Sequence, residues 1–429
     1  MRVLWITPII MPAVSRRLGS DDRGSGGWLG AMMPLLQQAD PAIDLSVITI
    51  YDGAKIVRFE EANVTYYLLP DKGSIFKDNP HILKCLHDAI LILKPDLIDI
   101  QGVEFHYAKY VNAAAPGIPI VATLQGLISE IYKHYCGCIS VYNLLKFRTL
   151  KDNLFLDGML ERKIDYQKRG VSEIEALQSI NYVIGRTSWD HSVCRAINPG
   201  LRYFYCQNNI REEFFGRTWK RDAVNSYSIF VAQSHTPYKG LHVLLEAASI
   251  VKGIVPNIKI VVAGRNMLDR STINQALRFG GYQKYIQYLI QKYGLGDIIY
   301  FTGPLDSSQM AEKMSKSHVF VLPSFVENSP NSLAEAQVMG VPSIAAFVGG
   351  VPDMVTHHET GLLYNSSDSA VLASLLQQIF FDDNLADHIS RTSRRYATER
   401  YNSSKGGSDL ANIYESIYCD YLKTSQDKS

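Results

Sequence analysis

Short apolar segments, separated by longer amphipathic ones, follow one another along the whole 429-residue chain. Each short segment is rich in Val, Ile and Leu and does not alternate with polar residues, which is typical of parallel strands covered on both faces. The amphipathic segments, such as 27–38 and 82–93, predict helices between the strands, so a doubly wound α/β structure is expected. The strands expected in the first half are 3–7, 45–51, 97–101, 119–124 and 182–185.

The same pattern starts again after a polar, charged stretch at 210–225. A chain of this length is too long for one ordinary core, so two domains are expected. We place an N-terminal domain at 1–210, a C-terminal domain at 211–405, and a final helix within 406–429 that packs back on the N-terminal domain. The strands expected in the second half are 228–232, 258–263, 299–302, 319–322 and 343–346.

Composition narrows the class of protein. A formal net charge of +1 argues against a nucleic-acid binder, and 46% hydrophobic with 20% charged residues is typical of a globular protein. Of the six cysteines only Cys136 and Cys138 are close together, which favours reduced thiols over a zinc site.

Pro8 and Pro12 interrupt the first apolar run, so it predicts a strand and not a signal peptide. With no apolar stretch long enough to span a bilayer, a cytoplasmic protein is expected.

The segment after the expected strand 319–322 has the signals of a helix at a ligand site. Ser329 is a good N-cap, Pro330 suits the first helical position, and Gly340 ends the helix. The helix N-terminus would open at the carboxyl edge of the sheet, where ligands of open α/β sheets bind and where phosphate or sugar oxygens are favoured.

Two acids accompany this helix, Glu327 before it and Glu335 eight positions later. Carboxylates at such a place suit a neutral, hydroxyl-rich ligand, because each can accept a pair of hydroxyl hydrogen bonds. The alternative is an acid favoured by the helix dipole together with a surface Glu.

A second constellation follows the expected strand 228–232. Lys239 and Gly240 open a helix at the end of a loop. Lysine here is a point charge for a diphosphate, and glycine permits close approach of the backbone. The alternative for Lys239 is a solvated surface charge.

Residues 324–346, with the text that continues to Tyr364, resemble the E-x7-E signature of retaining glycosyltransferase family 4. The resemblance implies the GT-B fold, in which two Rossmann-like, doubly wound domains face each other across a cleft. It implies catalytic roles for Glu327 and Lys239 and places Glu335 on the ribose of a nucleotide-sugar donor. Further donor-binding residues implied are Gly240, Ser234, Arg265, Asn328, Ser329, Asn331, Gly26 and Gly27.

In this set, Ser234 departs from the family pattern, and Gly26 and Gly27 match it only weakly. The family usually has Arg where this chain has Ser234, and His235 or Arg265 is the alternative cation. Gly26 and Gly27 resemble the family's N-domain loop near the donor phosphates, although a loop without ligand contact is the alternative.

The N-terminal domain offers three candidates for acceptor or sugar contact. The family often has a histidine where this chain has Gln125, whose amide can hydrogen-bond a sugar but cannot act as a general base. His106 and Arg186 each follow a neighbouring expected strand; a structural histidine is the alternative for His106.

The resemblance implies a metal-independent hexosyltransferase without a cofactor, with the nucleotide sugar as co-substrate and a glycan or lipid-linked molecule as acceptor. Its setting would be bacterial surface polysaccharide synthesis, and transfer would occur on the face from which the diphosphate leaves. The alternatives are a sugar-nucleotide epimerase of the same fold and a non-catalytic nucleotide-sugar-binding protein.

Residues 141–170 mix basic, aromatic and apolar side chains over several helical turns. Between Lys146 and Arg169 there are seven Lys or Arg and four acids, a net charge of +3. One interpretation is a surface helix pair packed on the first sheet. The other is a face for an acceptor or for peripheral contact with the inner face of a membrane.

Overall fold

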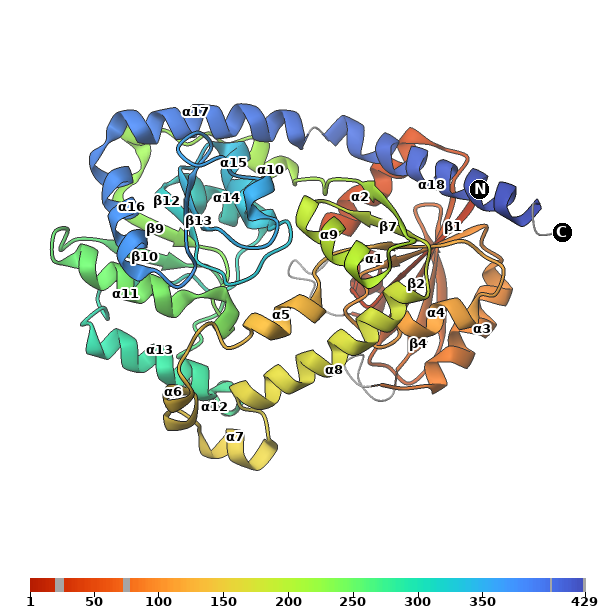
Figure 1. Ribbon diagram of the computed structural model, residues 1–429, viewed down its shortest axis with the longest axis horizontal. Coiled ribbons are helices and arrows are strands. Elements are labelled where there is room, and N and C mark those ends of the chain that lie inside the picture. The colour runs from red at the N-terminus through yellow and green to blue at the C-terminus, as the bar shows by residue number, and fades with distance from the viewer. Residues whose placement is uncertain (20–26, 72–77, 402, 427–429) are drawn as a thin grey trace. The chain divides into compact units, whose positions relative to one another are not determined.

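The computed structural model describes residues 1–19, 27–71, 78–401 and 403–426 (Figure 1). Its internal contacts divide the chain into two compact units. The first consists of Met1–Ser129, Lys168–Asn209 and Tyr401–Ser429, and the second of Glu130–Gln167 and Ile210–Arg400. This differs from the expected domain 1–210, because residues 130–167 are in contact with the second unit.

The first unit is built on an eight-stranded sheet with the order β3-β4-β2-β1-β5-β6-β7-β8. Its neighbours are parallel except for β3 and β4 at one edge. Five of these strands were predicted, and β3, β4 and β8 were not. The edge strands β3 and β8 are partly exposed and lack a continuous apolar run, whereas β4 is largely buried. The strands are β1 (Arg2–Thr7), β2 (Asp44–Tyr51), β3 (Val57–Glu61), β4 (Val64–Pro70), β5 (Leu97–Gln101), β6 (Ile120–Thr123), β7 (Tyr182–Gly185) and β8 (Arg202–Tyr205).

Both faces of this sheet are buried. Along β1, Leu4 and Ile6 enter one core cluster, and Val3 and Trp5 enter the other. Helix α18 packs against α2, and its Tyr414 accepts a 2.9 Å hydrogen bond from Trp5 Nε1. The helices are α1 (Pro12–Leu18), α2 (Gly27–Ala39), α3 (His81–Leu93), α4 (Ala108–Ala114), α9 (Ser188–Ile197) and α18 (Ser403–Gln426), with parts of α5 (Ile128–His134) and α8 (Met159–Gln178).

A buried carboxylate fixes the start of α5. Glu173 on α8 accepts hydrogen bonds from the backbone N–H groups of Ile128 (2.8 Å) and Ser129 (3.0 Å). Burial raises the pKa of Glu173 to about 8, against the opposing effect of these donors. The folded chain therefore holds a proton on this carboxyl over a pH range in which the unfolded chain has lost it.

We expect the free energy of unfolding to fall as pH rises from about 5 to the folded pKa of about 8, where the loss is complete. Over this range the titration of Glu173 lowers the free energy of unfolding by up to about 1.4 kcal/mol per pH unit. Urea titrations across this range should give a flatter profile for Glu173→Gln, which cannot ionise. The control is Glu175→Gln, whose side chain is half exposed; a wild-type slope in both variants would contradict the assignment.

The second unit contains a six-stranded parallel sheet with the order β11-β10-β9-β12-β13-β14. If β9 is numbered as strand 1, the order is 3-2-1-4-5-6, as in a Rossmann sheet. Strands β10 and β11 are added on one side of β9, and β12, β13 and β14 on the other, so the strand order reverses between β9 and β12. The strands are β9 (Asn225–Val231), β10 (Lys259–Val262), β11 (Ile299–Phe301), β12 (Ser317–Leu322), β13 (Ser343–Ala346) and β14 (Leu362–Tyr364).

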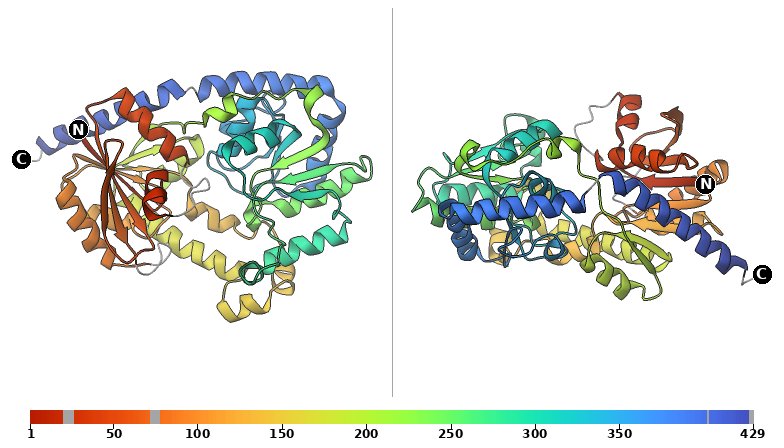
Figure 2. Two further views of the ribbon diagram at one scale, coloured as in Figure 1. Left: turned by 180° about the vertical axis from the view of Figure 1, so that it is seen from behind. Right: turned by 90° about the horizontal axis from the view of Figure 1, so that it is seen from above.

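Helices pack around this sheet, with α11 against α13 and α16 and with α15 against α14 and α17. Figure 2 shows α17 extending along the side of the unit that carries α15. The helices are α6 (Val141–Lys146), α7 (Leu150–Phe155), α10 (Glu212–Phe215), α11 (Leu241–Lys252), α12 (Ile273–Arg278), α13 (Gly281–Lys292), α14 (Ser307–Ser315), α15 (Asn331–Met339), α16 (Ser369–Phe381) and α17 (Asp383–Arg400), with 3₁₀ turns η1 (Arg221–Ala223), η2 (Pro237–Lys239) and η3 (Val351–Asp353).

The interpretation of 141–170 as a helix pair packed on the first sheet is wrong. The segment forms α6, α7 and the first part of α8, and α6 contacts α13 of the second unit. The Phe147 ring lies 5.2 Å from Tyr285 and 5.0 Å from Tyr288 of α13, centroid to centroid. This aromatic contact, which joins residues distant in sequence, determines where the segment packs. No helix in the described ranges is long and apolar enough to cross a membrane.

Candidate nucleotide-sugar site in the second unit

Two loops leave neighbouring strands at the point where the sheet order reverses. The loop after β9 ends at Lys239 and Gly240, and the loop after β12 leads through Glu327 into α15. Because β9 and β12 are parallel neighbours, both loops begin at the carboxyl edge of the sheet. In open α/β sheets this reversal opens a crevice that binds ligands.

Gly240 allows the two loops to approach each other. Its φ of +73° lies in the left-handed region, and a Cβ atom there would stand 1.8 Å from the carbonyl oxygen of Pro323. A second link is the 2.8 Å hydrogen bond from the Phe325 N–H to the Tyr238 carbonyl oxygen. Glycine is therefore required at 240 for backbone packing as well as for the entry into α11.

Lys239 and Glu327, the two predicted catalytic residues, form an ion pair. Lys239 Nζ lies 2.7 Å from Glu327 Oε1, and Ser324 Oγ donates to the same oxygen at 2.7 Å. The side chains of the pair are 17% and 11% exposed, so both can still be reached by a ligand. A cation and a carboxylate are thus held side by side at the crevice.

The backbone of Glu327 is fixed by a second close approach. Its carbonyl oxygen accepts a 3.0 Å hydrogen bond from the Gly350 N–H. Gly349 has a φ of +51°, and a Cβ on it would lie 1.9 Å from that same oxygen. Both glycines lie in the segment that carries the family resemblance, but the sequence did not predict that they position Glu327. That role follows from these two contacts.

Helix α15 begins one residue later than predicted. Its N-cap is Pro330, which has no side-chain acceptor, and Ser329 Oγ is directed to Met354 Sδ at 3.8 Å. The predicted end is confirmed, because Gly340 has a φ of +74° and caps the helix with its N–H. The first turn of α15 therefore receives no side-chain cap from Pro330, and it begins at the carboxyl edge of the sheet, where ligands of open α/β sheets bind.

Glu335 lies in the second turn of α15 and is almost completely buried. Arg211 donates to its Oε1 at 2.7 Å, and the side-chain exposures of the two residues are 31% and 7%. Burial raises the pKa of Glu335, and the Arg211 guanidinium opposes this rise. The alternative of a surface Glu at 335 is excluded by this burial. Arg211 was missed, because residues 210–225 were interpreted as a charged boundary.

The remaining predicted donor residues of this unit differ in exposure. Ser234 is fully buried, and its Oγ has no hydrogen-bond partner among the described residues. Asn328 is buried, Asn331 is half-buried, and Arg265 is exposed in the loop after β10. Ser234 carries no charge, and Arg265 is the exposed cation among these four residues.

Two of the three first-unit candidates are in contact. Arg186 Nη2 donates to Gln125 Oε1 at 3.1 Å, across the ends of β6 and β7. Arg186 is buried, which lowers its pKa. His106 is also buried, and its Nδ1 lies 2.6 Å from Ser172 Oγ, a contact typical of a structural histidine. Gly26 lies outside the described residues, and Gly27 is the first residue of α2.

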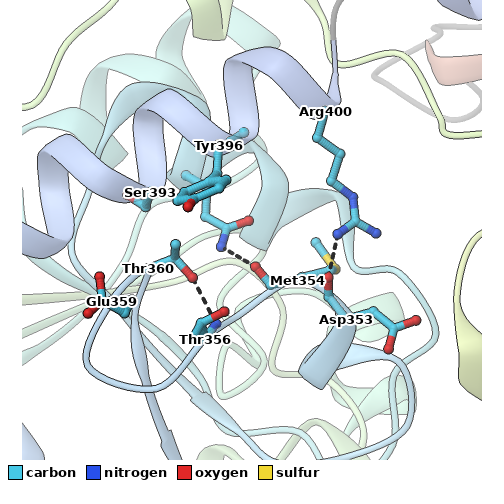
Figure 3. A pocket seen from close by; sticks show the side chains of 10 residues that line it. Asp353, Met354, Thr356, Glu359, Thr360, Ser393, Tyr396 and Arg400 are labelled. Atoms are coloured by element: carbon cyan, nitrogen blue, oxygen red, sulfur yellow. Dashed lines mark hydrogen bonds between the residues drawn. The ribbon is translucent and has the colours of Figure 1, made fainter.

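A cavity of about 370 Å³ lies on another side of α15, between the loop before β14 and α17 (Figure 3). Gln337, two residues after Glu335, lines it and donates from Nε2 to the Met354 carbonyl oxygen at 2.9 Å. Thr360 Oγ1 accepts from the Thr356 N–H at 2.8 Å within the facing loop. None of the predicted donor residues lines this cavity. On this side, the Gln337 hydrogen bond joins α15 to the backbone at Met354.

Within the described part of the chain, no three His, Cys, Asp or Glu side chains are grouped so that they could hold a metal ion. At the crevice itself, Lys239 presents an ammonium group that is 17% exposed beside Glu327.

Residues 219–396 match the family described as Glycosyl transferases group 1. The chain is 32% identical over 129 residues to the D-inositol 3-phosphate glycosyltransferase of Streptomyces avermitilis, which is 30% of this chain and 28% of that protein. It is 22% identical over 401 residues to the amylovoran biosynthesis glycosyltransferase AmsK of Erwinia amylovora, which is 88% and 93% of the two chains. The chain spans only 28% to 35% of the length of three of the curated relatives it matches.

Solved structures have the same fold. Sucrose-phosphate synthase from Thermosynechococcus elongatus superposes with a TM-score of 0.73 at 17% identity, over 98% of this chain and 100% of that one. HepE of Anabaena in complex with UDP-glucose gives a TM-score of 0.63 at 17% identity, over 97% and 100%. These likenesses confirm the predicted GT-B fold class, with two parallel-sheet α/β domains.

Proposed function

We propose, from the match of residues 219–396 to the glycosyl transferases group 1 family, that the chain transfers a hexosyl group from a nucleotide sugar to a glycan or lipid-linked acceptor. The observation that carries the proposal is the Lys239–Glu327 pair at the crevice between β9 and β12, beside the N-terminus of α15. AmsK, which is named for amylovoran biosynthesis, supports polysaccharide assembly as the setting. HepE, solved with UDP-glucose, supports a nucleotide-sugar donor.

Each charged group has a proposed role. The Lys239 ammonium and the first amides of α15 stabilise the diphosphate as it leaves. Glu327 faces the transferred sugar, and its pairing with Lys239 keeps the cation in position before the donor binds. Glu335 uses Oε2 for the ribose hydroxyls, since its Oε1 is held by Arg211.

We further propose that the reaction retains the configuration of the sugar. Fixed positioning of donor and acceptor provides much of the rate enhancement. The departing diphosphate takes the proton of the acceptor hydroxyl, which attacks on the same face. In the first unit, Gln125 and Arg186 are proposed to contact the acceptor or phosphate.

The proposal is tested by incubating the protein with a panel of nucleotide sugars and candidate glycan or lipid-linked acceptors and following release of the nucleoside diphosphate. NMR of the product identifies the configuration at the new linkage. Product with an inverted configuration would contradict the retaining mechanism. Recovery of an epimerised nucleotide sugar, formed without an acceptor, would indicate an epimerase. Binding without turnover would indicate a non-catalytic module.

Chelation gives a separate prediction. Because the Lys239 ammonium and helix amides are proposed to balance the diphosphate charge, EDTA should leave the turnover number unchanged. The measurement is the initial rate with and without EDTA, followed by addition of magnesium or manganese. A rate that disappears with EDTA and returns with either metal would contradict metal independence.

A further inference from the structure

Seven large apolar side chains are exposed on the α6–α7 hairpin of the second unit. They lie within residues 141–156 and are more than half exposed, up to 82% at Leu150. We call this set the α6–α7 patch: Val141, Tyr142, Leu145, Leu150, Leu154, Phe155 and Leu156. Figure 1 shows α6 beside α13 and α7 following it, on the side of the unit remote from α17.

The patch is not needed to hold the hairpin in place. Leu144 and Phe147 are the apolar residues of this stretch that are buried, and Phe147 packs on Tyr285 and Tyr288 of α13. The patch residues project from the other faces of the same short helices. Exposure of these apolar side chains to water is unfavourable and does not stabilise the fold. An exposed apolar patch of this kind is typical of a surface that binds a partner.

The hairpin is also locked in its conformation. Thr149 and Asp152 form a capping box at the start of α7, with N–H to side-chain oxygen distances of 2.8 and 3.1 Å. After α7, Leu156 has a φ of +50°, a conformation that is rarely adopted by such a residue, and its side chain is 70% exposed. The apolar side chains of the patch therefore extend from a hairpin whose second helix has a defined start and end.

The charges around the patch are mainly basic. Within 141–156 the bases are Lys146, Arg148 and Lys151, and the acid Asp152 is buried in the capping box. Acids of the adjoining turn partly neutralise two of them, because Arg148 pairs with Glu161 and Lys151 with Asp157, each at 2.8 Å.

Lys146 lies among rings and not beside a carboxylate. Its Nζ is 5.5 Å from the Tyr142 ring centroid and 5.2 Å from that of Tyr288. Lys284 of α13 adds a further base, with its Nζ 3.4 Å from the Arg148 carbonyl oxygen. The patch is thus an apolar tip with a basic border.

We propose that the α6–α7 patch inserts into the interface of an anionic lipid bilayer. Leu and Phe side chains would enter the region between headgroups and acyl chains, Tyr142 would lie at headgroup depth, and Lys146 would contact lipid phosphates. A hairpin of two six-residue helices is small for a stable protein interface, which buries about 800 Å² on each side. The inference does not depend on the chemistry of the crevice.

The test is co-sedimentation of the full chain with vesicles of phosphatidylcholine alone or mixed with phosphatidylglycerol, at low and high salt. The wild type should bind the anionic vesicles at low salt and lose most of this binding at high salt. Leu154→Ser/Phe155→Ser should lower the partition coefficient about tenfold or more, because two apolar side chains no longer insert.

The matched control is Ile254→Ser/Phe381→Ser, which removes two side chains that are each 57% exposed elsewhere on the same unit. It should bind as the wild type does, and thermal melts should be alike for all three proteins. Equal binding of wild type and patch variant, or equal binding to both vesicle types, would overturn the proposal. So would sedimentation velocity that detects a wild-type dimer abolished by the patch variant, because the occupant would then be a second copy of the chain.

Discussion

Lys239→Ala is expected to lower kcat by about 10²–10³-fold while weakening donor binding much less. The reason is that negative charge on the diphosphate grows as the glycosidic bond breaks, so the ammonium interacts more strongly with the departing group than with the bound donor. The measurement is the initial rate as a function of donor concentration. A rise in KM with unchanged kcat would indicate that Lys239 only anchors the donor.

The ion pair with Glu327 complicates this variant, because removal of Lys239 leaves a carboxylate that is 11% exposed beside the diphosphate. Lys239→Ala/Glu327→Gln removes that repulsion. If the charge of Lys239 acts on the diphosphate, the double variant should regain donor affinity but not turnover. Lys259→Ala is the matched control, since this exposed lysine lies at the opposite, amino end of β10. It should have wild-type kinetics.

Glu335→Ala should weaken nucleotide-sugar binding by about 1.5–3 kcal/mol, a loss of about 10- to 150-fold in Kd. The loss follows from removal of a charged acceptor for the ribose hydroxyls. Calorimetry with the intact donor and with the free nucleoside diphosphate should give the same loss for both, because both contain the ribose. Unchanged affinity would contradict the ribose assignment. Glu312→Ala, which removes a half-exposed acid on α14, is the control.

The partner of Glu335 should behave differently. In Glu335→Ala, the Arg211 side chain, which is 31% exposed, can turn to water, so we expect this variant to fold normally. Arg211→Ala instead leaves a buried carboxylate without its cation, and we expect a stability loss of about 1–3 kcal/mol. Since burial already raises the pKa of Glu335, this loss should be greatest at neutral pH and should diminish as pH falls toward 5. Urea titrations at both pH values separate this effect from a general loss of packing.

The sequence alone determined the alternation of strands and helices and the position of the crevice. Continuous apolar runs of parallel strands and the turn at Gly340 are local signals, and they placed β9, β12 and α15 almost where they are found. The family resemblance then assigned Lys239, Glu327 and Glu335 to the same ligand. The partly exposed edge strands β3 and β8 were missed because they lack the continuous apolar pattern. Strands β4 and β14 were also missed; β14 is only three residues long.

Only the tertiary structure decided which charges meet and which surfaces remain uncovered. Lys239 and Glu327 are 88 positions apart, and Arg211 and Glu335 are 124 apart, so no local pattern pairs them. The placement of 130–167 on the second unit depends in the same way on Phe147 packing against α13. Burial and ion pairing depend on atoms that the whole fold brings together, so they cannot be obtained from spacing along the chain. The exposure of the α6–α7 patch likewise follows from the packing of Phe147 on α13.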